Sequence, residues 1–388
     1  MNLTARAVRR AVAVTAVTGA VALIPAIALA APTGPARAGA PAAAPAGFKA
    51  NSITWLSPSL GRVLGAAPCG TSTCSDVIGT SNAGKSWGLI GTVKAPLAKQ
   101  GQSASPGITD IRFATPAAGW AFAPELFRTT DGGRTWASQQ IPGHGKQILA
   151  LAASPAGAWA VVSPCAWGTG LCSHKPLSLW RTSAQAGGTW TSIPLDLPIN
   201  VVASVAVHGT TVYVVDGSVS TLAKGKLYVS TDGRHFSART SPCSASKDVF
   251  LAEAVPTSAT DVSFLCDGNP GFSKAIKTVY RSVDTGKTDT FAGQMGPYGI
   301  QAQLAASPSG NLAVASWSDG SFIYVNDTHQ RAWTMVIGSG DGGAGWNDIT
   351  YVTNTVAWVV YGPADMAADY GQLYVTRDAG LHWTLAKV

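Results

Sequence analysis

The sequence predicts an all-β fold built from seven similar units, and three observations lead to that prediction. A turn motif of the form [ST]-x-D-x-G-x-x-W recurs along the chain, and its copies end at positions 87, 136, 190, 236, 289, 333 and 383. These positions are 44 to 54 residues apart, a spacing typical of repeat architectures. Four short runs rich in Val, Ile, Trp and Tyr, bounded by Gly, Pro, Ser and Asn, surround each copy and are typical of strands. Four strands repeated seven times predict a seven-bladed β-propeller of four-stranded antiparallel blades over residues 48–388.

The second and last copies show the expected strand order. In the second copy we expect strands at residues 108–114, 120–123, 126–129 and 136–141; in the last, at 348–352, 356–361, 373–376 and 383–388. The motif joins the third strand to the fourth in each unit. If each blade begins with the first strand of its copy and ends with the fourth, the first and last blades share no strand, although residues 46–50 are candidates for an additional one.

The motif residues have the chemistry of a structural turn. An Asp or Asn at the third position accepts hydrogen bonds from turn N–H groups, the Gly adopts a backbone angle that other residues resist, and the aromatic residue packs between sheets. We assign structural roles in these turns to Asn82, Trp87, Asp131, Trp136, Trp190, Asp232, Asp284, Trp333, Asp378 and Trp383.

Several copies depart from the motif. The third has Gln185 where Asp is expected, the fourth is one residue shorter and ends in Phe236, and the fifth has Asp289 in place of the Trp. The sixth keeps little beyond its Trp. These departures do not disturb the spacing of the repeat.

The stretch F-x-x-x-x-x-G-W followed by R-T-T-D-G-G-R-T-W, residues 113–136, resembles the Asp-box or BNR repeat. That repeat is shared by sialidases, sortilin-type receptors and photosystem assembly-factor propellers, and the stretch looks most similar to the last group. The resemblance covers residues 48–388 and implies the propeller fold. It says little about function, because the family includes both enzymes and binding proteins.

The N-terminal residues have the features of an export signal. Arg6, Arg9 and Arg10 precede an apolar run that ends in A-L-A at residue 30, so we expect a signal peptide over residues 1–30. A membrane anchor is the alternative, although the run is rich in Ala and interrupted by Pro25. The Arg pair suggests the twin-arginine route as an alternative to the general secretory one. Residues 31–47, rich in Pro, Ala and Gly, are expected to form a linker.

Charge and cysteine content narrow the class of protein further. The formal net charge is +7, and three of the Arg residues lie in the expected signal peptide, so the mature chain is too mildly basic to favour nucleic acid. The six Cys allow fifteen pairings in an exported chain. Sequence proximity favours Cys69–Cys74 and Cys165–Cys172, which leaves Cys243–Cys266. No spacing matches a zinc site.

A literal P-loop pattern, G-x-x-x-x-G-K-[ST], is present at residues 79–86. A P-loop requires a following helix whose N-terminus faces the phosphates. Here a strand-like run follows, and the stretch is the first copy of the repeated turn. We therefore expect no nucleotide at this site.

Binding residues are expected on the face that carries the loops between second and third strands and the connections between blades, because these loops vary most in length. Aromatic and acidic residues there suit a glycan or peptide, and the alternative is that they are solvated residues and loop anchors. The binding candidates are Trp167, Phe272, Trp317, Asp319, Trp346, Asp365 and Asp369.

The sequence offers no complete catalytic set. A sialidase needs three Arg for the substrate carboxylate, a Tyr beside a Glu, and an Asp acid, whereas most Arg here lie at the motif turns. A glycosidase with two carboxylates remains open. The weak catalytic candidates are Asp110, Arg112, Glu125, Tyr298 and Tyr370.

These observations predict a secreted or cell-surface protein that binds or assembles a cell-envelope or extracellular protein or glycan without catalysis. A sialidase-like glycoside hydrolase and a purely structural surface protein are the alternatives. We expect a monomer with no membrane span after cleavage, no nucleic acid or nucleotide partner, and no cofactor or metal. Ca²⁺ bound by the Asp-containing loop at residues 338–348 is the one alternative.

Overall fold

The computed structural model describes residues 42–98, 106–143, 147–165, 176–185, 187–197, 202–217, 225–245, 249–268, 274–326, 332–339, 345–364 and 370–388 of the 388. The expected signal peptide lies outside this part of the chain, as does most of the expected linker. Contacts divide the chain into two units, Met1–Ala40 and Pro41–Val388. The second unit is the subject of everything that follows.

This unit is a seven-bladed β-propeller, as the repeat predicts. Each blade is a four-stranded antiparallel sheet made of consecutive strands. The strands of the first four blades are β1 (Lys49–Trp55), β2 (Gly61–Cys69), β3 (Ser72–Thr80), β4 (Gly88–Val93); β5 (Asp110–Phe113), β6 (Gly119–Phe122), β7 (Leu126–Thr129), β8 (Ala137–Ser138); β9 (Gln147–Ser154), β10 (Gly157–Ser163), β11 (Leu177–Thr182), β12 (Thr191–Leu197); and β13 (Val202–His208), β14 (Thr211–Gly217), β15 (Lys226–Ser230), β16 (Ser237–Arg239).

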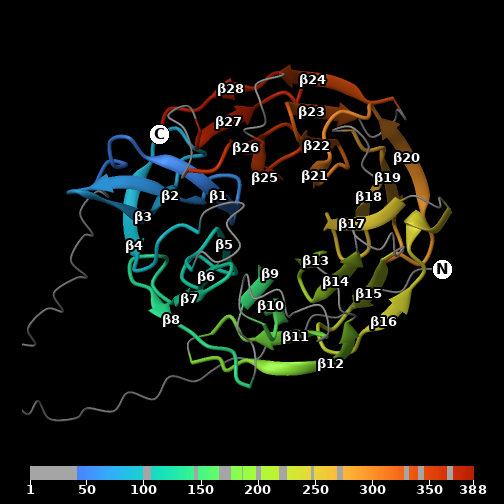
Figure 1. The fold of residues 1–388 in the computed structure, drawn as a ribbon, viewed down its shortest axis with the longest axis horizontal. Coiled ribbons are helices and arrows are strands. Elements are labelled where there is room, and N and C mark those ends of the chain that lie inside the picture. The colour runs from blue at the N-terminus through green and yellow to red at the C-terminus, as the bar shows by residue number, and fades with distance from the viewer. Residues whose placement is uncertain are drawn as a thin grey trace, which may run out of the picture. The chain divides into compact units, whose positions relative to one another are not determined.

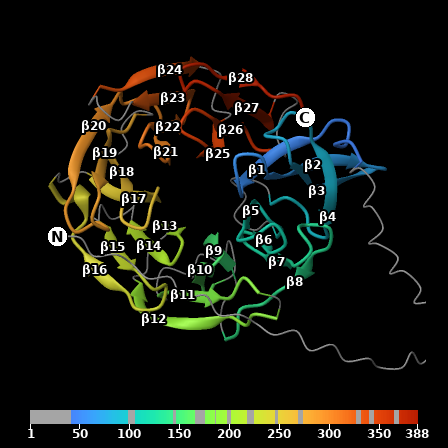
Figure 2. The same ribbon diagram turned by 180° about the vertical axis from the view of Figure 1, so that it is seen from behind.

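Blades 5 to 7 repeat the same order around the ring (Figure 1). Their strands are β17 (Val249–Pro256), β18 (Val262–Gly268), β19 (Lys277–Ser282), β20 (Thr290–Met295); β21 (Gln301–Ala306), β22 (Leu312–Trp317), β23 (Ser321–Asn326), β24 (Thr334–Ser339); and β25 (Trp346–Tyr351), β26 (Ala357–Tyr361), β27 (Gln372–Thr376), β28 (Thr384–Leu385). In the described residues the helical content is one 3₁₀ turn, Pro242–Ala245, and no helix there could cross a membrane. In both views the first strand of each blade faces the central opening (Figures 1 and 2).

Apolar packing between blades provides the core. The buried side chains of the described part form seven clusters, and each cluster joins two adjacent blades. The blade 7–blade 1 cluster brings Trp358 within 5.8 Å of Trp87 and 5.3 Å of Trp55, measured between ring centroids. Burial of such large side chains stabilises each contact by about 25 cal/mol per Å² of apolar area. The ring is therefore held together by seven equivalent interfaces.

Ring closure uses packing and hydrogen bonds, because no strand is shared between blades 1 and 7. The Ala50 N–H donates to the carbonyl of Gly371 at 2.6 Å, which joins the two blades directly. Residues 42–44 lie along β4, where the Leu89 N–H donates to the Ala42 carbonyl at 2.8 Å. The propeller unit thus extends into the segment expected to be linker. This pairing lies within blade 1, whereas of the candidate residues 46–50 Lys49 and Ala50 belong to β1 itself.

The recurrent motif forms the turn between the third and fourth strands. In blade 2, Asp131 Oδ1 accepts hydrogen bonds from Thr129 Oγ1 at 2.8 Å and the Thr135 N–H at 2.9 Å. Gly133, at a φ of 99°, donates its N–H to Thr129 Oγ1 at 2.8 Å, and Trp136 Nε1 donates to the Gly133 carbonyl at 2.9 Å. The same serine or threonine-to-carboxylate contact recurs at Asp232, Asp284 and Asp378 and, with an amide oxygen, at Asn82.

The motif aromatics pack on the preceding blade. Trp190 lies 6.5 Å from Trp120 of blade 2, and Trp136 lies 6.0 Å from Phe113 within its own blade while joining the cluster between blades 1 and 2. Trp333 and Trp383 pack against the clusters between blades 5 and 6 and between blades 6 and 7. Each aromatic thus covers one blade interface at its motif end.

The third copy differs from the alignment that the sequence suggested. Thr182 is the last residue of β11, as Thr129 is the last residue of β7, so Ala184 and not Gln185 lies where the carboxylate is expected. The turn has one extra residue before Trp190. Arg128 of blade 2 replaces the missing carboxylate by donating to the carbonyls of Ser183, Ala184, Gln185 and Gly188. The turn is therefore organised mainly through its carbonyl groups, together with the Gln185 N–H, which donates to Ser183 Oγ at 2.9 Å.

The P-loop-like stretch is one of these turns. The strand β4 follows it directly, so no helix N-terminus is present to receive a phosphate. Ser86 N–H donates to Asn82 Oδ1 at 3.0 Å, as expected for the repeated turn. The structure therefore confirms a turn at this position.

Candidate functional site

The central channel is the most polar cavity shared by all the blades. Residues from all seven first strands line it, and its volume is about 420 Å³. One position recurs on each first strand, and the residue that follows it along the chain packs in the apolar clusters between blades. The seven residues at this position are Ser52, Asp110, Ala150, Ser204, Glu253, Gln303 and Asp348, and they pair with equivalent residues of the second strands.

These side chains form a belt that links neighbouring first strands. Asp348 Oδ2 accepts from the Ile53 N–H of blade 1 at 3.1 Å, and Ser52 Oγ accepts from the Ile111 N–H of blade 2 at 3.2 Å. Glu253 Oε2 accepts from the Leu304 N–H of blade 6 at 2.7 Å. First strands are not hydrogen-bonded to one another as a sheet, so their inner N–H groups need partners from side chains.

β-Bulges position several belt residues. The pairing of β1 with β2 skips one residue between Ala50 and Ser52, and β17 and β25 show the same shift before Glu253 and Asp348. A bulge leaves one residue unpaired and turns the next side chain. In β1 the skipped residue is Asn51, whose amide binds the Thr109 carbonyl at 2.7 Å and joins the network at the channel mouth.

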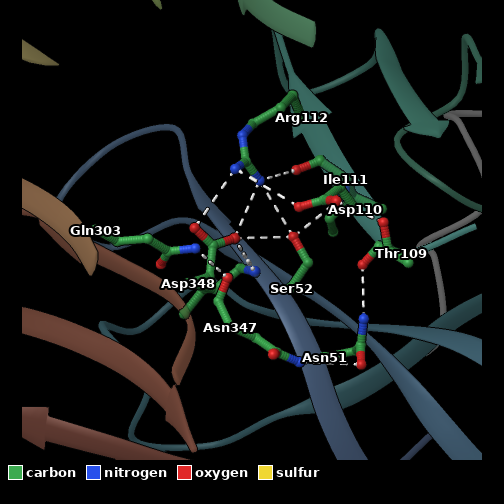
Figure 3. Close-up of polar contacts among 10 residues, drawn as sticks. Asn51, Ser52, Thr109, Asp110, Ile111, Arg112, Gln303, Asn347 and Asp348 are labelled. Carbon is green, nitrogen blue, oxygen red and sulfur yellow. Dashed lines mark hydrogen bonds and ion pairs between the residues drawn. The ribbon is translucent and has the colours of Figure 1, made fainter. Parts of the chain in front are cut away.

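Arg112 is the centre of this network, and its contacts span three blades (Figure 3). Its Nη1 lies 3.1 Å from Asp348 Oδ2 and its Nη2 lies 3.4 Å from Asp348 Oδ1, a two-point pairing of guanidinium and carboxylate. Nη1 also donates to Ser52 Oγ at 3.1 Å and to the Ile111 carbonyl at 2.8 Å. Asp110 Oδ1 lies 3.8 Å from Nη2. Blades 7, 1 and 2 are joined at the point of ring closure.

Position along the strand explains why Arg112 alone reaches this far. The equivalent residues of the other blades are Thr54, Ala152, Ala206, Val255, Ala305 and Thr350. All six are smaller, so they leave room for the guanidinium to cross in front of blade 1. The sequence expectation that Arg112 lies on a first strand near the channel is met.

Three ionisable groups of the site have shifted pKa values. Burial tends to lower the pKa of Arg112, but the neighbouring Asp348 and Asp110 carboxylates outweigh it and raise that pKa. Burial raises the pKa of Asp110, and Arg112 and the Thr109 hydroxyl partly offset this rise. Burial raises the pKa of Glu253 to about 7, although its carboxylate accepts the Leu304 N–H. The pKa of Glu253 therefore lies near neutrality.

The weak catalytic candidates are not brought together. Asp110 and Arg112 line the channel, whereas Glu125, Tyr298 and Tyr370 are absent from its described lining. Glu125 is exposed in the β6–β7 hairpin, and Tyr370 packs edge-on against Tyr361 at 6.0 Å. Among the described residues Arg112 is the single Arg of the channel lining, and three would be needed for a sialidase.

The binding candidates have different surroundings. Trp346 is 2% exposed and packs against Tyr361 and Tyr374, so a ligand does not reach it. Trp317 is half-buried against the backbone of Gly345, and Asp319 is exposed in the β22–β23 hairpin, where it accepts from Ser318 Oγ at 2.8 Å. Trp167, Phe272, Asp365 and Asp369 lie outside the described residues.

Tyr298 is exposed on the loop-bearing face, yet it is held firmly. Its side chain is 44% exposed, its ring stacks on Phe322 at 5.2 Å, and Lys274 Nζ lies 5.4 Å from its centroid. Below it, the fully buried Lys277 donates from Nζ to the carbonyls of Gly299 at 2.6 Å and Ala275 at 3.0 Å. The connection between blades 5 and 6 is thereby bound to the segment that precedes β19.

Two disulfides brace the same face. Cys69 pairs with Cys74 across the β2–β3 hairpin, and Cys243, in the 3₁₀ turn, pairs with Cys266 of β18. Cys165 is also disulfide-bonded, and its expected partner, Cys172, lies outside the described residues. Across the described segments, no group of three His, Cys, Asp or Glu residues is arranged to hold a metal ion.

Of the polar belt residues, the sequence analysis selected Asp110 as a candidate site residue and missed five. Ser52, Ser204, Glu253 and Gln303 each lie in an ordinary strand-like run with no motif of its own, and Asp348 entered as the last residue of the loop considered for Ca²⁺. Aligning the first strands of the seven repeats would have found them, since a polar residue at the same position in six of seven blades is unusual beside a buried core.

Comparisons with known proteins show the fold and leave the function open. No protein-family model and no curated protein matches the chain. It is similar to a solved structure of YCF48 bound to a D1 peptide, with a TM-score of 0.52 and 12% identity over 87% of this chain and 95% of that one. It is also similar to an oligogalacturonate lyase from Vibrio parahaemolyticus, with a TM-score of 0.53 and 10% identity over 81% and 86%. YCF48 from Cyanidioschyzon merolae has a TM-score of 0.47 and 16% identity over 72% and 85%.

Proposed function

We propose that this chain is an exported, non-catalytic binding or assembly protein whose loop-bearing face holds an extended segment of a cell-envelope or extracellular protein. The observation that carries the proposal is the rigid presentation of Tyr298. Its exposed ring stacks on Phe322, and the fully buried Lys277 binds the backbone of its connection, so the ring can contact a partner with little loss of conformational freedom. Export is supported by the two disulfides, which persist in oxidising compartments.

The surroundings of Tyr298 suit a protein partner. Ile276 is 50% exposed and lies on the segment that pairs with the Tyr298 connection through Ala275, whose N–H donates to the Pro297 carbonyl at 3.0 Å. The binding energy of protein interfaces is concentrated at a few aromatic residues such as Tyr. A side chain that is already fixed loses little entropy on binding. We name Tyr298, Ile276 and Lys274 together the Tyr298 platform.

A peptide segment fits this platform better than a glycan does. An apolar Ile beside the Tyr favours an apolar side chain of the partner, and the Lys274 ammonium favours a nearby carboxylate. The solved propeller of similar fold that holds a peptide supports the same class of partner. A bound glycan would instead be expected beside several fixed carboxylates and amides, whereas the described residues offer Tyr, Ile and Lys here.

A glycoside hydrolase is the second candidate, and Glu253 is the feature that favours it. A carboxyl group with a pKa near 7 in a channel has the protonation behaviour of a general acid. Against this, Arg112 is already paired with Asp348, so a substrate carboxylate would have to displace a protein carboxylate. The belt contacts give Glu253 a structural role that requires no substrate.

Peptide display distinguishes the two candidates. A library of random peptides is selected on the purified propeller, and the enriched peptides are tested on Tyr298→Ala and on Leu381→Ala. Leu381 is a control because it is 55% exposed in the motif turn of blade 7, at the opposite end of the blades from the platform. The same preparations are assayed against fluorogenic glycosides, with Glu253→Gln as the inactive control. Enriched peptides that depend on Tyr298 support the proposal; glycoside hydrolysis that Glu253→Gln abolishes overturns it.

A further inference from the structure

Equivalent Arg residues at the motif face differ in how their hydrogen bonds are satisfied. Arg128 and Arg181 each precede the last residue of a third strand and pair with Trp120 and Trp159 of the second strand. Both guanidinium groups also lie over the ring of that Trp, at 5.3 Å and 5.6 Å from the centroids. They are therefore the same structural position in blades 2 and 3.

The Nη atoms of Arg128 are used by the fold. They donate to carbonyl groups of the extended blade 3 turn, as described above. That turn needs Arg128 because its own carboxylate is missing. With these protein acceptors, the Nη atoms of Arg128 have no capacity left for a ligand.

Arg181 faces a different turn. The blade 4 turn that it approaches is shorter and is closed from within by Asp232, which accepts from Ser230 Oγ at 2.9 Å and the His235 N–H at 2.8 Å. Among the described residues, the Nη atoms of Arg181 make one long hydrogen bond, from Nη2 to the Ala156 carbonyl at 3.4 Å. Its Nε, like that of Arg128, is buried and has no hydrogen-bond partner there. The two residues therefore differ in their Nη atoms, since those of Arg181 lack the turn carbonyls that Arg128 binds.

A cavity of about 600 Å³ opens at this point between blades 3 and 4. Its described lining includes Arg181, Arg234 and His235 together with the hydroxyl residues Thr189, Thr191 and Ser192. Burial lowers the pKa of Arg181, and the like charge of Arg234 lowers it further, while Asp232 raises it. The Asp232 carboxylate is already bound by its own turn, so the two guanidinium groups are incompletely neutralised.

We propose that this cavity binds the oxyanion of a phosphate or sulfate group through Arg181 and Arg234. Guanidinium groups bind such anions with two parallel hydrogen bonds, and hydroxyl groups around them supply further donors. Several donors on different sides suit a tetrahedral oxyanion better than a planar carboxylate. The site lies on the motif-turn face, at the opposite end of the blades from the Tyr298 platform, so it does not rest on the proposed peptide binding.

Isothermal titration at constant ionic strength tests the site with inorganic phosphate, inorganic sulfate and acetate as separate probes. The wild-type chain is expected to bind phosphate and sulfate saturably and acetate more weakly. Arg181→Gln and Arg234→Gln should each weaken binding roughly tenfold, since a lost charge-assisted hydrogen bond is worth about 1.4 kcal/mol or more. Arg377→Gln removes the same charge from an exposed turn residue of blade 7 and should leave binding unchanged.

Two further measurements, on Arg234→Gln and with dextran sulfate, complete the test of the anion site. Arg234 is exposed, so its replacement leaves the fold intact and keeps the test valid if Arg181→Gln unfolds. Dextran sulfate in place of the free ion shows whether a polymer-borne group binds more tightly than the ion. Equal weakening by Arg377→Gln would show non-specific attraction to positive charge and overturn the proposal. Absence of saturable binding of both phosphate and sulfate would overturn it as well.

Discussion

Arg112 of blade 2 and Asp348 of blade 7 form a two-point ion pair in front of blade 1, with 3.1 Å between Nη1 and Oδ2. The pair joins residues 236 positions apart in the sequence and closes the ring where no strand is shared. Ser52 of the intervening blade donates to the same Asp348 oxygen at 2.9 Å. We call the three residues the closure clamp.

Loss of the clamp's cation should destabilise the propeller. Arg112→Met leaves Asp348 partly buried without its partner, and we expect the free energy of unfolding to fall by about 2–4 kcal/mol. Urea denaturation measures the change. The double variant Arg112→Met/Asp348→Asn should recover part of the loss, because no unpaired charge then remains. A single variant as stable as Arg377→Gln would show that the clamp contributes nothing to stability.

Stability should fall as the pH rises through neutrality, because of Glu253. Its pKa in the folded state is about 7, above its ordinary value of 4.5. A raised carboxyl pKa contributes stability that is fully present below the unfolded value and lost as the pH rises through the folded value. The wild-type chain should thus be more stable at pH 5 than at pH 8, by on the order of 2 kcal/mol from this group.

The Glu253→Gln variant isolates that contribution. Asp267 is also buried with a pKa raised to about 7, so some pH dependence should persist in the variant. We expect the difference in unfolding free energy between variant and wild type to grow in favour of the variant from pH 5 to pH 8. A difference that is constant over this range would contradict a raised pKa for Glu253. Chemical denaturation at each pH provides the values.

A motif turn is held either by its own Asp or, in blade 3, by Arg128 of the neighbouring blade, so different substitutions should destabilise the two kinds of turn. Asp131→Ala removes an acceptor from an exposed turn and should cost about 1–2 kcal/mol, comparable to the loss of a helix cap. Arg128→Met removes the shared donor of several carbonyls in the blade 3 turn and should cost at least as much, with faster amide exchange around Thr189. Denaturation combined with hydrogen exchange measures both. Unchanged exchange in Arg128→Met would show that the turn holds its shape without the Arg.

Removal of the Lys277 ammonium should loosen the Tyr298 platform. The carbonyl of Gly299 also accepts the Ala275 N–H at 3.1 Å, and that of Tyr298 accepts Ser316 Oγ at 2.8 Å, so both keep a donor. Because Lys277 faces the buried Asp267 carboxyl, Lys277→Met alone should also destabilise the fold, whereas replacement of both charged partners is often neutral. In Lys277→Met/Asp267→Asn we therefore expect faster amide exchange at residues 297–299 and an unfolding midpoint close to that of wild type. Unaltered exchange there would mean that Lys277 does not fix the connection.

The fold was readable from the sequence because the repeat is carried by local chemistry. The third-to-fourth strand turns need a hydroxyl, an acceptor and a Gly at fixed spacing, and Thr129, Asp131 and Gly133 show why. The turns between consecutive strands then set the order of the four strands in each blade. The third copy escaped correct alignment because Arg128, on β7 of the preceding blade, supplies what the local sequence of the turn after Thr182 lacks. A local motif carries no information about contacts between blades.

Part of the candidate site could also be predicted, because some of its residues are recognisable from their place in the repeat. Arg112 is predicted because it lies on a first strand and not at a motif turn, and Asp110 because it is one carboxylate of a possible pair, whereas Ser52 and Asp348 matter only through their contact across the closed ring. Trp346 is expected on the open face because it follows a variable loop, yet it pairs with Tyr361 at the start of β25 and packs against that ring in the core. Burial of an aromatic residue at a strand end depends on register, which composition does not reveal.

The affinity of a display-selected peptide for Tyr298→Ala, compared with wild type and Leu381→Ala, tests the account's central claim most directly. Titration calorimetry should show a Kd at least tenfold weaker for Tyr298→Ala and unchanged for Leu381→Ala, because a hot-spot Tyr contributes more than about 1.4 kcal/mol. Unfolding midpoints of the three proteins should agree, since Tyr298 is a surface residue. Equal affinity of all three proteins for the peptide, or the absence of any enriched peptide, would contradict a protein-binding platform at Tyr298.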